Sequence, residues 1–374
     1  FSISVLHNCR IFRSFKSPNP FYMPALNFFR NIVAISLMMF VINNAAAQYR
    51  EQSFCEVTPD WDNVQINKGQ IPDGVTKIFF ITNRPYISEA EDGILFPNDI
   101  SEYRKVSYFI ATCDGSRWQL TFVPDFNSGM KEINDGRDIL LFIEGHGKSL
   151  PMALNRAFQI QDRYDVSLLV FDWPSKNSNF NKSLARVRRC GDNFYNLLLQ
   201  IRDYRPSFMS ENQNFSIICH SLGNYFMTNF IVCGDGQYLK EKIVDNVVLN
   251  SAAIRTKEHG VVISQIEFAE RIYITSNKND FVLRGAHLLT SGKMLGNQVM
   301  KPYAENAEYL NFTSVAGREH SYYFGYHEFE HTNPAFFYFY NTALHGNKVN
   351  LEDENYFSPR PEGDGYDVRI KDKR

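Results

Sequence analysis

The stretch Cys219-His220-Ser221-Leu222-Gly223 decides the fold that this sequence predicts. It closes a short apolar run, residues 215–219, and precedes a helical pattern that begins at Asn224. A strand that ends at a serine and turns directly into a helix holds the hydroxyl exposed at the strand's carboxyl end, beside backbone N–H groups. Chemistry that needs an alcohol beside fixed donors is acyl transfer. The usual pattern is Gly-x-Ser-x-Gly, and Cys219 replaces the first glycine, so an ordinary turn stays open until the rest of the chain is considered.

Composition excludes one class of partner and allows a large core. The 374 residues carry a net charge of −2 with no dense basic cluster, so we expect no nucleic-acid partner. The hydrophobic fraction of 44%, with 32 Phe and 20 Tyr, is ample for burial. Length alone allows two domains, although α/β folds of about 250 residues often form one.

The N-terminal region has the pattern of a secretory signal. Residues 1–22 show no pattern, and we interpret them as an untranslated upstream segment before Met23. Arg30, an apolar run over 32–42 and Ala45-Ala46-Ala47-Gln48 follow, which predicts a signal peptide over 23–47. The apolar run is half of the about 20 residues that a bilayer-spanning helix needs. We therefore expect a secreted or periplasmic protein with no membrane span in the mature chain; an uncleaved anchor is the alternative.

The cysteines fit that location. Cys55, in an N-terminal extension over 48–75, and Cys113 are able to pair in an oxidising compartment. Cys190, Cys219 and Cys233 lie on apolar stripes or runs, so we expect them in the core. Without a C-x-x-C pair, the sequence gives no support for a thiolate zinc site.

From residue 76 onward, strand-like and helix-like segments alternate. The short apolar runs are residues 78–81, 139–143, 168–171, 215–219, 247–249 and 272–274. Because both faces of these runs are apolar, they predict strands of a parallel sheet that helices cover on both sides. Amphipathic stretches over 184–201, from 151, from 224 and over 333–344 supply the helices.

The same alternation sets the expected domain. Residues 105–112 and 118–123 look like antiparallel edge strands that precede it. We expect one α/β domain over 76–346 with a mostly parallel, doubly wound sheet. The charged segment 347–374, with four Pro and Gly residues, predicts a flexible, non-catalytic tail.

A nucleophilic serine needs a base and an acid that orients the base, in the chain order Ser, Asp or Glu, His. Asp280 fits the acid because it ends the polar loop 276–280 after a predicted strand, at the edge where such sheets form sites. An apolar run follows at once, so Asp280 also fits a helix N-cap, and the two roles are compatible.

Three histidines follow the last candidate strand, residues 309–315. His320 comes soonest after it and is the preferred base, with His331 as the alternative base and His327 third. His327-Glu328-Phe329-Glu330-His331 also matches H-E-x-x-H, a zinc motif that requires a helix. Asn333-Pro334 interrupts the chain two residues later, so we prefer a polar loop and expect no metal.

The oxyanion hole needs two backbone N–H groups. Leu222, the residue after the nucleophile, supplies one. The other is expected from His146 or Gly147 in Glu144-Gly145-His146-Gly147, where the glycines allow a sharp turn after the strand 139–143. The alternative is a plain glycine turn.

These motifs together resemble the bacterial α/β-hydrolases long catalogued as a domain of unknown function. Matching segments are Ile81-Thr82-Asn83-Arg84, Glu144-Gly145, Asp172-Trp173-Pro174-Ser175, Cys219-His220-Ser221-Leu222-Gly223-Asn224, Ser276 to Asp280, and His320-Ser321-Tyr322-Tyr323-Phe324. They occur in the family's order over about 76–346. The resemblance implies the α/β-hydrolase fold and strengthens Asp280 and His320.

Three departures from the family pattern bear on the site. Glu144 replaces a histidine beside the expected oxyanion hole, where a carboxylate turned inward would oppose an oxyanion and one turned to an arginine or solvent would not. Asp172 replaces a serine and is a rival acid, although it precedes Ser221. Residues 325–330 are an extra stretch after His320.

The sequence therefore predicts an esterase-like serine hydrolase that uses Ser221, His320 and Asp280, requires no cofactor and acts on a small-molecule or acyl-ester substrate, with amides as an option. The alternatives are a catalytically inactive binding or scaffold protein of the same fold, and acyl transfer to an acceptor other than water. The fold alone does not select among them. The sequence makes no prediction of oligomeric state.

Overall fold

The computed structural model describes residues 64–67, 71–72, 74–87, 95–102, 105–113, 118–176, 179–290, 292–324, 333–361 and 364–370. All of them belong to one unit, Gln52–Arg374. The predicted signal peptide, Cys55, His327 and His331 lie outside the described residues.

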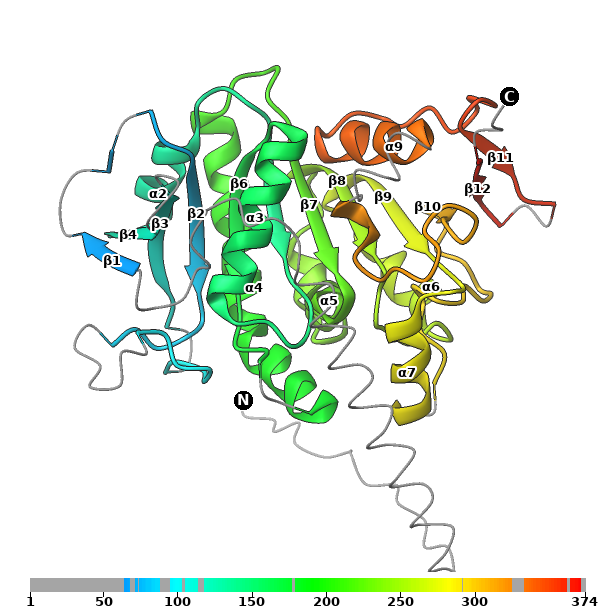
Figure 1. The fold of residues 1–374 in the computed structure, drawn as a ribbon, viewed down its shortest axis with the longest axis horizontal. Coiled ribbons are helices and arrows are strands. Elements are labelled where there is room, and N and C mark those ends of the chain that lie inside the picture. The colour runs from blue at the N-terminus through cyan, green and yellow to red at the C-terminus, as the bar shows by residue number, and fades with distance from the viewer. Residues whose placement is uncertain are drawn as a thin grey trace, which may run out of the picture. The chain divides into compact units, whose positions relative to one another are not determined.

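One mixed sheet runs through the described residues (Figure 1). Its strands are β1 (Val64–Asn67), β2 (Lys77–Thr82), β3 (Ser107–Cys113), β4 (Trp118–Val123), β5 (Ile139–Ile143), β6 (Ser167–Asp172), β7 (Phe215–His220), β8 (Val244–Asn250), β9 (Ala269–Ser276), β10 (Ala307–Asn311), β11 (Phe357–Pro359) and β12 (Tyr366–Val368). Their order is β1-β4-β3-β2-β6-β5-β7-β8-β9-β10-β12-β11. The central pairs from β2 to β10 are all parallel, whereas β3 pairs antiparallel with β2 and β4. The predicted α/β fold is confirmed.

Helices cover both faces of the sheet. They are α2 (Phe126–Ile133), α3 (Leu150–Tyr164), α4 (Phe180–Phe208), α5 (Asn224–Val232), α6 (His259–Ile263), α7 (Phe281–Thr290) and α9 (Pro334–Leu344). Apolar residues of α2, α4, α5, α6 and α7 belong to one core cluster, and those of α3 and α9 belong to a second. Along β5, Leu141 contributes to the first cluster and its neighbours Leu140 and Phe142 to the second. Successive strand residues point to opposite faces, which is why these central runs are apolar throughout.

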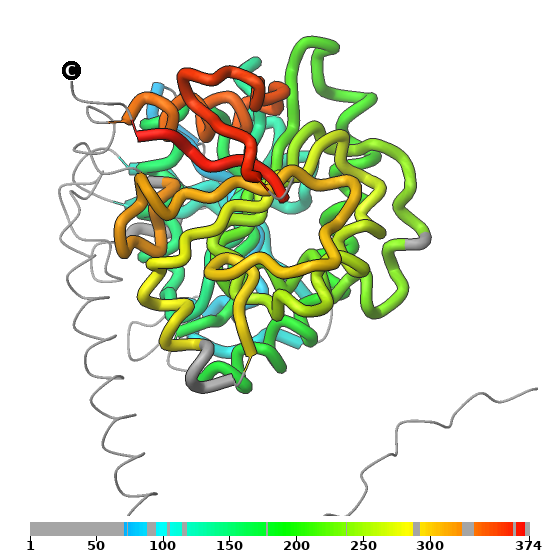
Figure 2. Tube along the Cα trace, turned by 90° about the vertical axis from the view of Figure 1, so that its right-hand side faces the viewer, coloured from blue at the N-terminus to red at the C-terminus, as the bar shows by residue number. Residues whose placement is uncertain are grey.

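The sheet extends beyond both predicted domain limits. β1 pairs in parallel with β4, so β4 is not an edge strand. β12 pairs in parallel with β10, and β11 pairs antiparallel with β12, so the prediction of a flexible tail over 347–374 is wrong for these segments. Figure 2 shows the red C-terminal segment, which includes β12, beside the orange segment that includes β10. The Ser314 hydroxyl donates to Val368 O (2.8 Å) and Asn333 Nδ2 donates to Arg369 O (2.9 Å), which fixes this segment to the domain.

The cysteines follow the expectation in part. Cys113 is disulfide-bonded, and its predicted partner Cys55 lies outside the described residues. Cys190 and Cys219 are free and buried, as predicted. Cys233 is exposed, so its assignment to the core is wrong; it is the C-cap residue of α5, where the helix leaves the core.

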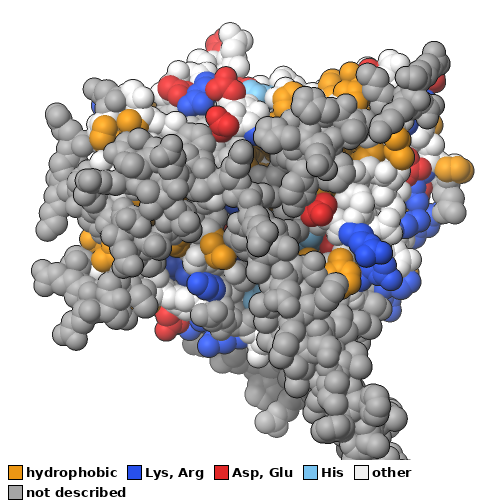
Figure 3. Space-filling view, viewed as in Figure 1, with side chains coloured by type: hydrophobic (Ala, Val, Ile, Leu, Met, Phe, Trp, Pro, Cys, Tyr) orange, Lys and Arg blue, Asp and Glu red, His pale blue; other side chains and the backbone are white. Residues whose placement is uncertain are grey.

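Parallel pairing brings several loops to one edge of the sheet. Ile143 at the end of β5 pairs with Cys219, and His220 at the end of β7 pairs with Asn250 at the end of β8. The loops after β5, β7, β8 and β9 therefore meet at this carboxyl edge, where open parallel sheets form their sites. Within the described part of the chain, no helix has the length and apolarity to cross a bilayer. Basic and acidic side chains occupy several separate places on the face drawn in Figure 3.

Candidate active site

Ser221 lies on a strained turn between β7 and α5. β7 ends at His220, a 3₁₀ turn covers Ser221–Gly223, and α5 begins at Asn224. Ser221 has φ = +52°, a left-handed conformation that non-glycine residues adopt only when the surroundings enforce it. Its carbonyl accepts Asn224 Nδ2 (2.8 Å) and Ala253 N (3.0 Å), and these bonds hold the turn. The residue is 7% exposed, so the predicted exposed position is wrong.

Two glycines allow the turn to approach the loop after β5. A Cβ on Gly223 would lie 2.7 Å from Glu144 O, and a Cβ on Gly145 would lie 2.6 Å from Ser221 Cβ. Neither distance leaves room for a side chain. The same Cβ position on Gly145 is 3.3 Å from Ser221 Oγ, so the hydroxyl lies over the 144–147 loop, beside the predicted oxyanion hole. Close backbone approach is therefore the reason for both glycines.

Asp280 is fully buried and has two hydrogen-bonding roles. Its Oδ2 accepts Nδ1 of His320 at 2.6 Å, and its Oδ1 accepts the backbone N–H of Leu283 at 2.9 Å. The second bond is an N-cap of α7, which satisfies one of the helix's free N–H groups. The structure therefore combines the cap with a contact to a histidine, the two roles that the sequence allowed.

The loop that carries His320 is tied to the loop that carries Asp280. Asn277 Nδ2 donates to Glu319 O (3.0 Å) and Gly317 O (3.2 Å), and Ser251 Oγ donates to His320 O (2.7 Å). His320 is 6% exposed. Because its Nδ1 faces Asp280, Nε2 is the ring nitrogen left for another partner.

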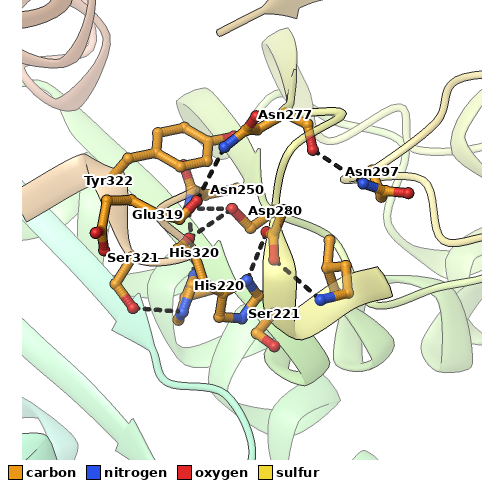
Figure 4. A network of polar contacts seen from close by, with 12 residues as sticks. His220, Ser221, Asn250, Asn277, Asp280, Asn297, Glu319, His320, Ser321 and Tyr322 are labelled. Carbon is orange, nitrogen blue, oxygen red and sulfur yellow. Dashed lines mark hydrogen bonds and ion pairs between the residues drawn. The ribbon is translucent and has the colours of Figure 1, made fainter. Parts of the chain in front are cut away.

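Figure 4 draws Ser221 at the edge of the His320 ring that faces away from Asp280. Within the described residues, no hydrogen bond joins the Ser221 hydroxyl to this ring. Such catalytic contacts are often long before substrate binds.

The oxyanion loop differs from the prediction at Gly147. The Gly147 N–H donates to Ser175 O (3.2 Å), so its assignment as an oxyanion donor is wrong, because the bond occupies the N–H. The Gly145 N–H is also occupied, by Glu144 Oε1 at 2.6 Å. Within the described residues, the N–H groups of His146 and Leu222 remain without a hydrogen-bond acceptor.

Glu144 is turned toward an arginine rather than toward Ser221. Its Oε2 pairs with Arg156 Nη1 at 2.7 Å, and both side chains are buried. Burial raises the pKa of the Glu144 carboxyl, but Arg156, Lys148 and the Gly145 N–H together hold that pKa below its ordinary value. Glu144 is therefore an ionised group whose charge is balanced by a cation on α3.

The rival acid Asp172 is fully engaged elsewhere. Its carboxylate accepts Arg84 Nε (2.8 Å) and the Thr82 hydroxyl (2.6 Å), and all three residues are buried. Arg84 also donates to Trp173 O (2.9 Å). This cluster fixes the ends of β2 and β6 and does not contact His320.

The His146 side chain contacts α4 and belongs to no metal-binding cluster among the described residues. His146 Nδ1 lies 2.8 Å from Ser183 Oγ, and burial, followed by Lys148 and Arg186, lowers the pKa of this imidazole. No group of three His, Cys, Asp or Glu side chains is arranged to hold a metal among the described residues. The H-E-x-x-H stretch lies outside them.

Sequence reasoning missed a buried polar layer beneath His320. It contains His220, Asn250, Ser251, Thr275, Ser321, Tyr322 and Tyr340. His220 and Ser321 are the residues next to Ser221 and His320 in sequence. That adjacency was the only signal available, because single polar residues in apolar surroundings show no periodicity.

Two surface pockets in the described part of the chain lie away from this site. One, of about 420 Å³, lies against Phe337, Tyr338 and Tyr356. The other, of about 360 Å³, lies between β3 and α4, next to Tyr108 and Gln200. Neither pocket is lined by Ser221, His320 or Asp280.

Comparison with known proteins identifies the family. Residues 124–314, just over half of the chain, match the family described as "Alpha/beta hydrolase of unknown function (DUF900)"; the match includes Ser221 and Asp280 and ends before His320. No curated protein matches the chain.

Similar solved structures include esterase B of Lactobacillus rhamnosis (9% identity, 82% of this chain and 95% of that chain, TM-score 0.38) and an esterase of Rhizomucor miehei (11%, 64% and 78%, 0.36). An acylaminoacyl peptidase of Pyrococcus horikoshii is also similar (12%, 65% and 48%, 0.27). From the family match, the chain belongs to the α/β hydrolases of unknown function.

Proposed function

We propose that this chain is a serine hydrolase that cleaves esters, and amides as an option, through an acyl-enzyme. Ser221 is the nucleophile, His320 the general base and Asp280 the group that orients it. The observation that carries the proposal is the 2.6 Å bond between His320 Nδ1 and Asp280 Oδ2, beside a serine in a left-handed turn. A base oriented by a buried carboxylate is the arrangement that activates a neutral alcohol.

The chemistry follows from these positions. Ser221 Oγ attacks the acyl carbonyl while His320 Nε2 takes the hydroxyl proton, and Asp280 stabilises the imidazolium that forms. The N–H groups of Leu222 and His146, which have no acceptor among the described residues, stabilise the oxyanion. The imidazolium then protonates the leaving alcohol, and a water molecule activated by His320 cleaves the acyl-enzyme and restores Ser221.

The charge near the expected oxyanion hole is compatible with this mechanism. Glu144 pairs with Arg156 at 2.7 Å and with the Gly145 N–H at 2.6 Å. Both oxygens therefore face donors. The pair as a whole adds no net charge to the loop.

Hydrolysis of an activated ester tests the proposal. Wild type should hydrolyse it and Ser221→Ala should not. Ser216→Ala is the matched control, since Ser216 is a buried serine on β7, the strand that precedes Ser221, and bonds to Ala343 O. We expect the control to retain activity. Hydrolysis that survives Ser221→Ala would contradict the mechanism, and loss of activity with a chelator would favour the zinc alternative.

An inactive binding or scaffold protein is the second candidate. The burial of Ser221 and the missing bond to His320 favour it. It predicts that folded wild type hydrolyses no ester in a broad panel of acyl lengths. Product analysis with added alcohols separates hydrolysis from acyl transfer.

We propose further that the protein is exported and that its signal peptide is removed near Gln48. The disulfide at Cys113 supports an oxidising compartment. Mass spectrometry of the N-terminus in the natural host tests this. A chain that retains Met23 would contradict it.

A further inference from the structure

His220 forms a bridge between the segments that carry Ser221 and His320. Its Nε2 lies 3.2 Å from the Ser321 hydroxyl, and its Nδ1 lies 3.2 Å from Asn250 Nδ2 (Figure 4). The His220 and His320 rings are 4.6 Å apart between centroids, at an interplanar angle of 51°. The residue before the proposed nucleophile therefore bonds to the residue after the proposed base.

The hydrogen bonds around Asn250 determine which nitrogen of His220 carries the proton. Asn250 Oδ1 accepts the hydroxyls of Tyr340 (2.5 Å) and Thr275 (3.0 Å), so its NH₂ group faces His220. Nδ1 of His220 must then be the acceptor, and Nε2 carries the hydrogen that is donated to Ser321. The tautomer is set by a buried network and not by solvent.

His220 is also suited to remain neutral. It is 2% exposed, and burial, followed by the neighbouring His320, Arg156 and Lys148, lowers its pKa well below the ordinary value. A neutral His220 ring does not repel the positive charge that forms on His320 during acyl transfer. A second imidazolium at 4.6 Å would oppose it.

A second tether acts on the same segment. Ser251 has φ = +44° and donates its hydroxyl to His320 O at 2.7 Å. It fixes the backbone of His320, while the His220–Ser321 bond fixes the next residue and the ring contact limits how the imidazole tilts. Asp280 alone fixes one ring nitrogen and leaves rotation about that bond free.

We propose that His220 is a positioning residue: its Nε2–H···Oγ bond to Ser321 and its ring contact hold the imidazole of His320 in register with Ser221. The inference rests on the proposed function. It adds an element to the site that acts on the base through a ring contact and through the residue after the base, separately from the bond to Asp280.

Two substitutions at the same position separate positioning from packing. The amide nitrogen of His220→Gln reaches the place of Nε2 and retains the donor to Ser321, whereas His220→Asn reaches only the place of Nδ1 and loses it. Ser321→Ala removes the acceptor. We expect His220→Asn and Ser321→Ala to lower kcat about 10²-fold with KM unchanged, since small misplacement of a catalytic group costs that much. His220→Gln should retain kcat within a few-fold.

A double-mutant cycle tests the coupling. If the bond acts as a unit, His220→Asn/Ser321→Ala should be no slower than either single variant. Ser216→Ala is the control for loss of a buried serine hydroxyl, on the strand β7 that carries His220, and should leave kcat unchanged. Thermal unfolding of each variant shows that the chain is folded.

These measurements distinguish failure of the positioning role of His220 from failure of the proposed hydrolase function. ¹⁵N NMR of the wild-type imidazoles should show His220 protonated at Nε2 alone, whether or not the protein turns over. Ser321→Ala with wild-type kcat, additive losses in the cycle, or an Nδ1–H tautomer would overturn the positioning role while Ser221 chemistry stands. Wild type that hydrolyses no ester would overturn the proposed function and this inference with it.

Discussion

The carboxylate of Asp280 bonds to His320 through one oxygen, at 2.6 Å, while its other oxygen accepts the N–H of Leu283 at the start of α7. The two residues are 40 positions apart in the chain. The helix start holds the carboxylate in place, and the carboxylate orients the imidazole. Secondary structure and the proposed chemistry therefore depend on the same side chain.

Asp280→Asn separates these two functions. Asparagine caps helices as well as aspartate does, so stability should change little. Its amide NH₂ is unable to accept Nδ1–H if it faces His320, and the tautomer required of the base is lost. We expect kcat to fall about 10⁴-fold with the unfolding midpoint nearly unchanged. Asp280→Ala should lose similar activity and also about 1 kcal/mol of stability for the cap. Urea unfolding and ester kinetics on the same samples measure both, and equal activity of Asp280→Asn and wild type would contradict the role.

The effects of substituting Glu144 and Arg156 on the free energy of unfolding should depend on each other. Glu144→Gln retains an acceptor for the Gly145 N–H but removes the carboxylate that pairs with the buried Arg156 cation, which should cost about 3–5 kcal/mol. Arg156→Met should be similarly destabilising. The double variant Glu144→Gln/Arg156→Met should recover most of the loss, because no buried charge then lacks a partner. Additive destabilisation in chemical unfolding would contradict the pairing.

Substitution by alanine should have different effects on activity at Gly145 and at Gly147. A Cβ on Gly145 would lie 2.6 Å from Ser221 Cβ and 3.1 Å from His220 O, so Gly145→Ala should displace the proposed nucleophile and abolish ester hydrolysis. Gly147 has φ = +86° with nothing within 4 Å of a Cβ, so Gly147→Ala should cost about 1–3 kcal/mol from strain and retain most of kcat. The reverse ranking in activity would contradict the position assigned to Ser221.

His345 lies at the edge of the sheet opposite Ser221. It should make the stability of the folded chain depend on pH. Its Nδ1 lies 2.8 Å from Asp138 Oδ2, and this hydrogen bond raises the pKa of His345 despite the opposing effect of burial. A raised pKa means that the folded state binds the proton more tightly than the unfolded state. The stability that protonated His345 contributes is therefore complete below its ordinary pKa of about 6.5, and it is lost as pH rises through the pKa of the folded state.

The comparison is wild type against His345→Asn by urea unfolding. The stability difference should be larger at pH 5.5 than at pH 8.5. A difference that grows with rising pH would contradict the assignment.

The sequence was informative where the physical cause is local. Strands buried on both faces, such as β5 and β7, must be apolar throughout, and the serine turn must use a small residue at Gly223. The chain order of Ser221, Asp280 and His320 follows from the order of the strands. Each of these expectations needs only nearby residues or the general architecture.

The remaining features depend on contacts between distant segments. β12 is three residues long and exists as a strand because it pairs with β10, and no pattern in Tyr366-Asp367-Val368 predicts that partner. The bond from Gly147 N–H to Ser175 O removes a predicted oxyanion donor, and the acceptor belongs to another loop. The His220–Ser321 contact spans 101 positions. Single polar residues carry no periodic signal, so these contacts become visible only in three dimensions.

The central claim is that Ser221 is a nucleophile, and the most direct measurement is the site of covalent reaction. Wild type would be treated with a fluorophosphonate, and the modified peptide identified by mass spectrometry. We predict one adduct per chain on Ser221, formed much faster than in Asp280→Asn. Folded wild type without an adduct, or with one on another residue, would contradict the account.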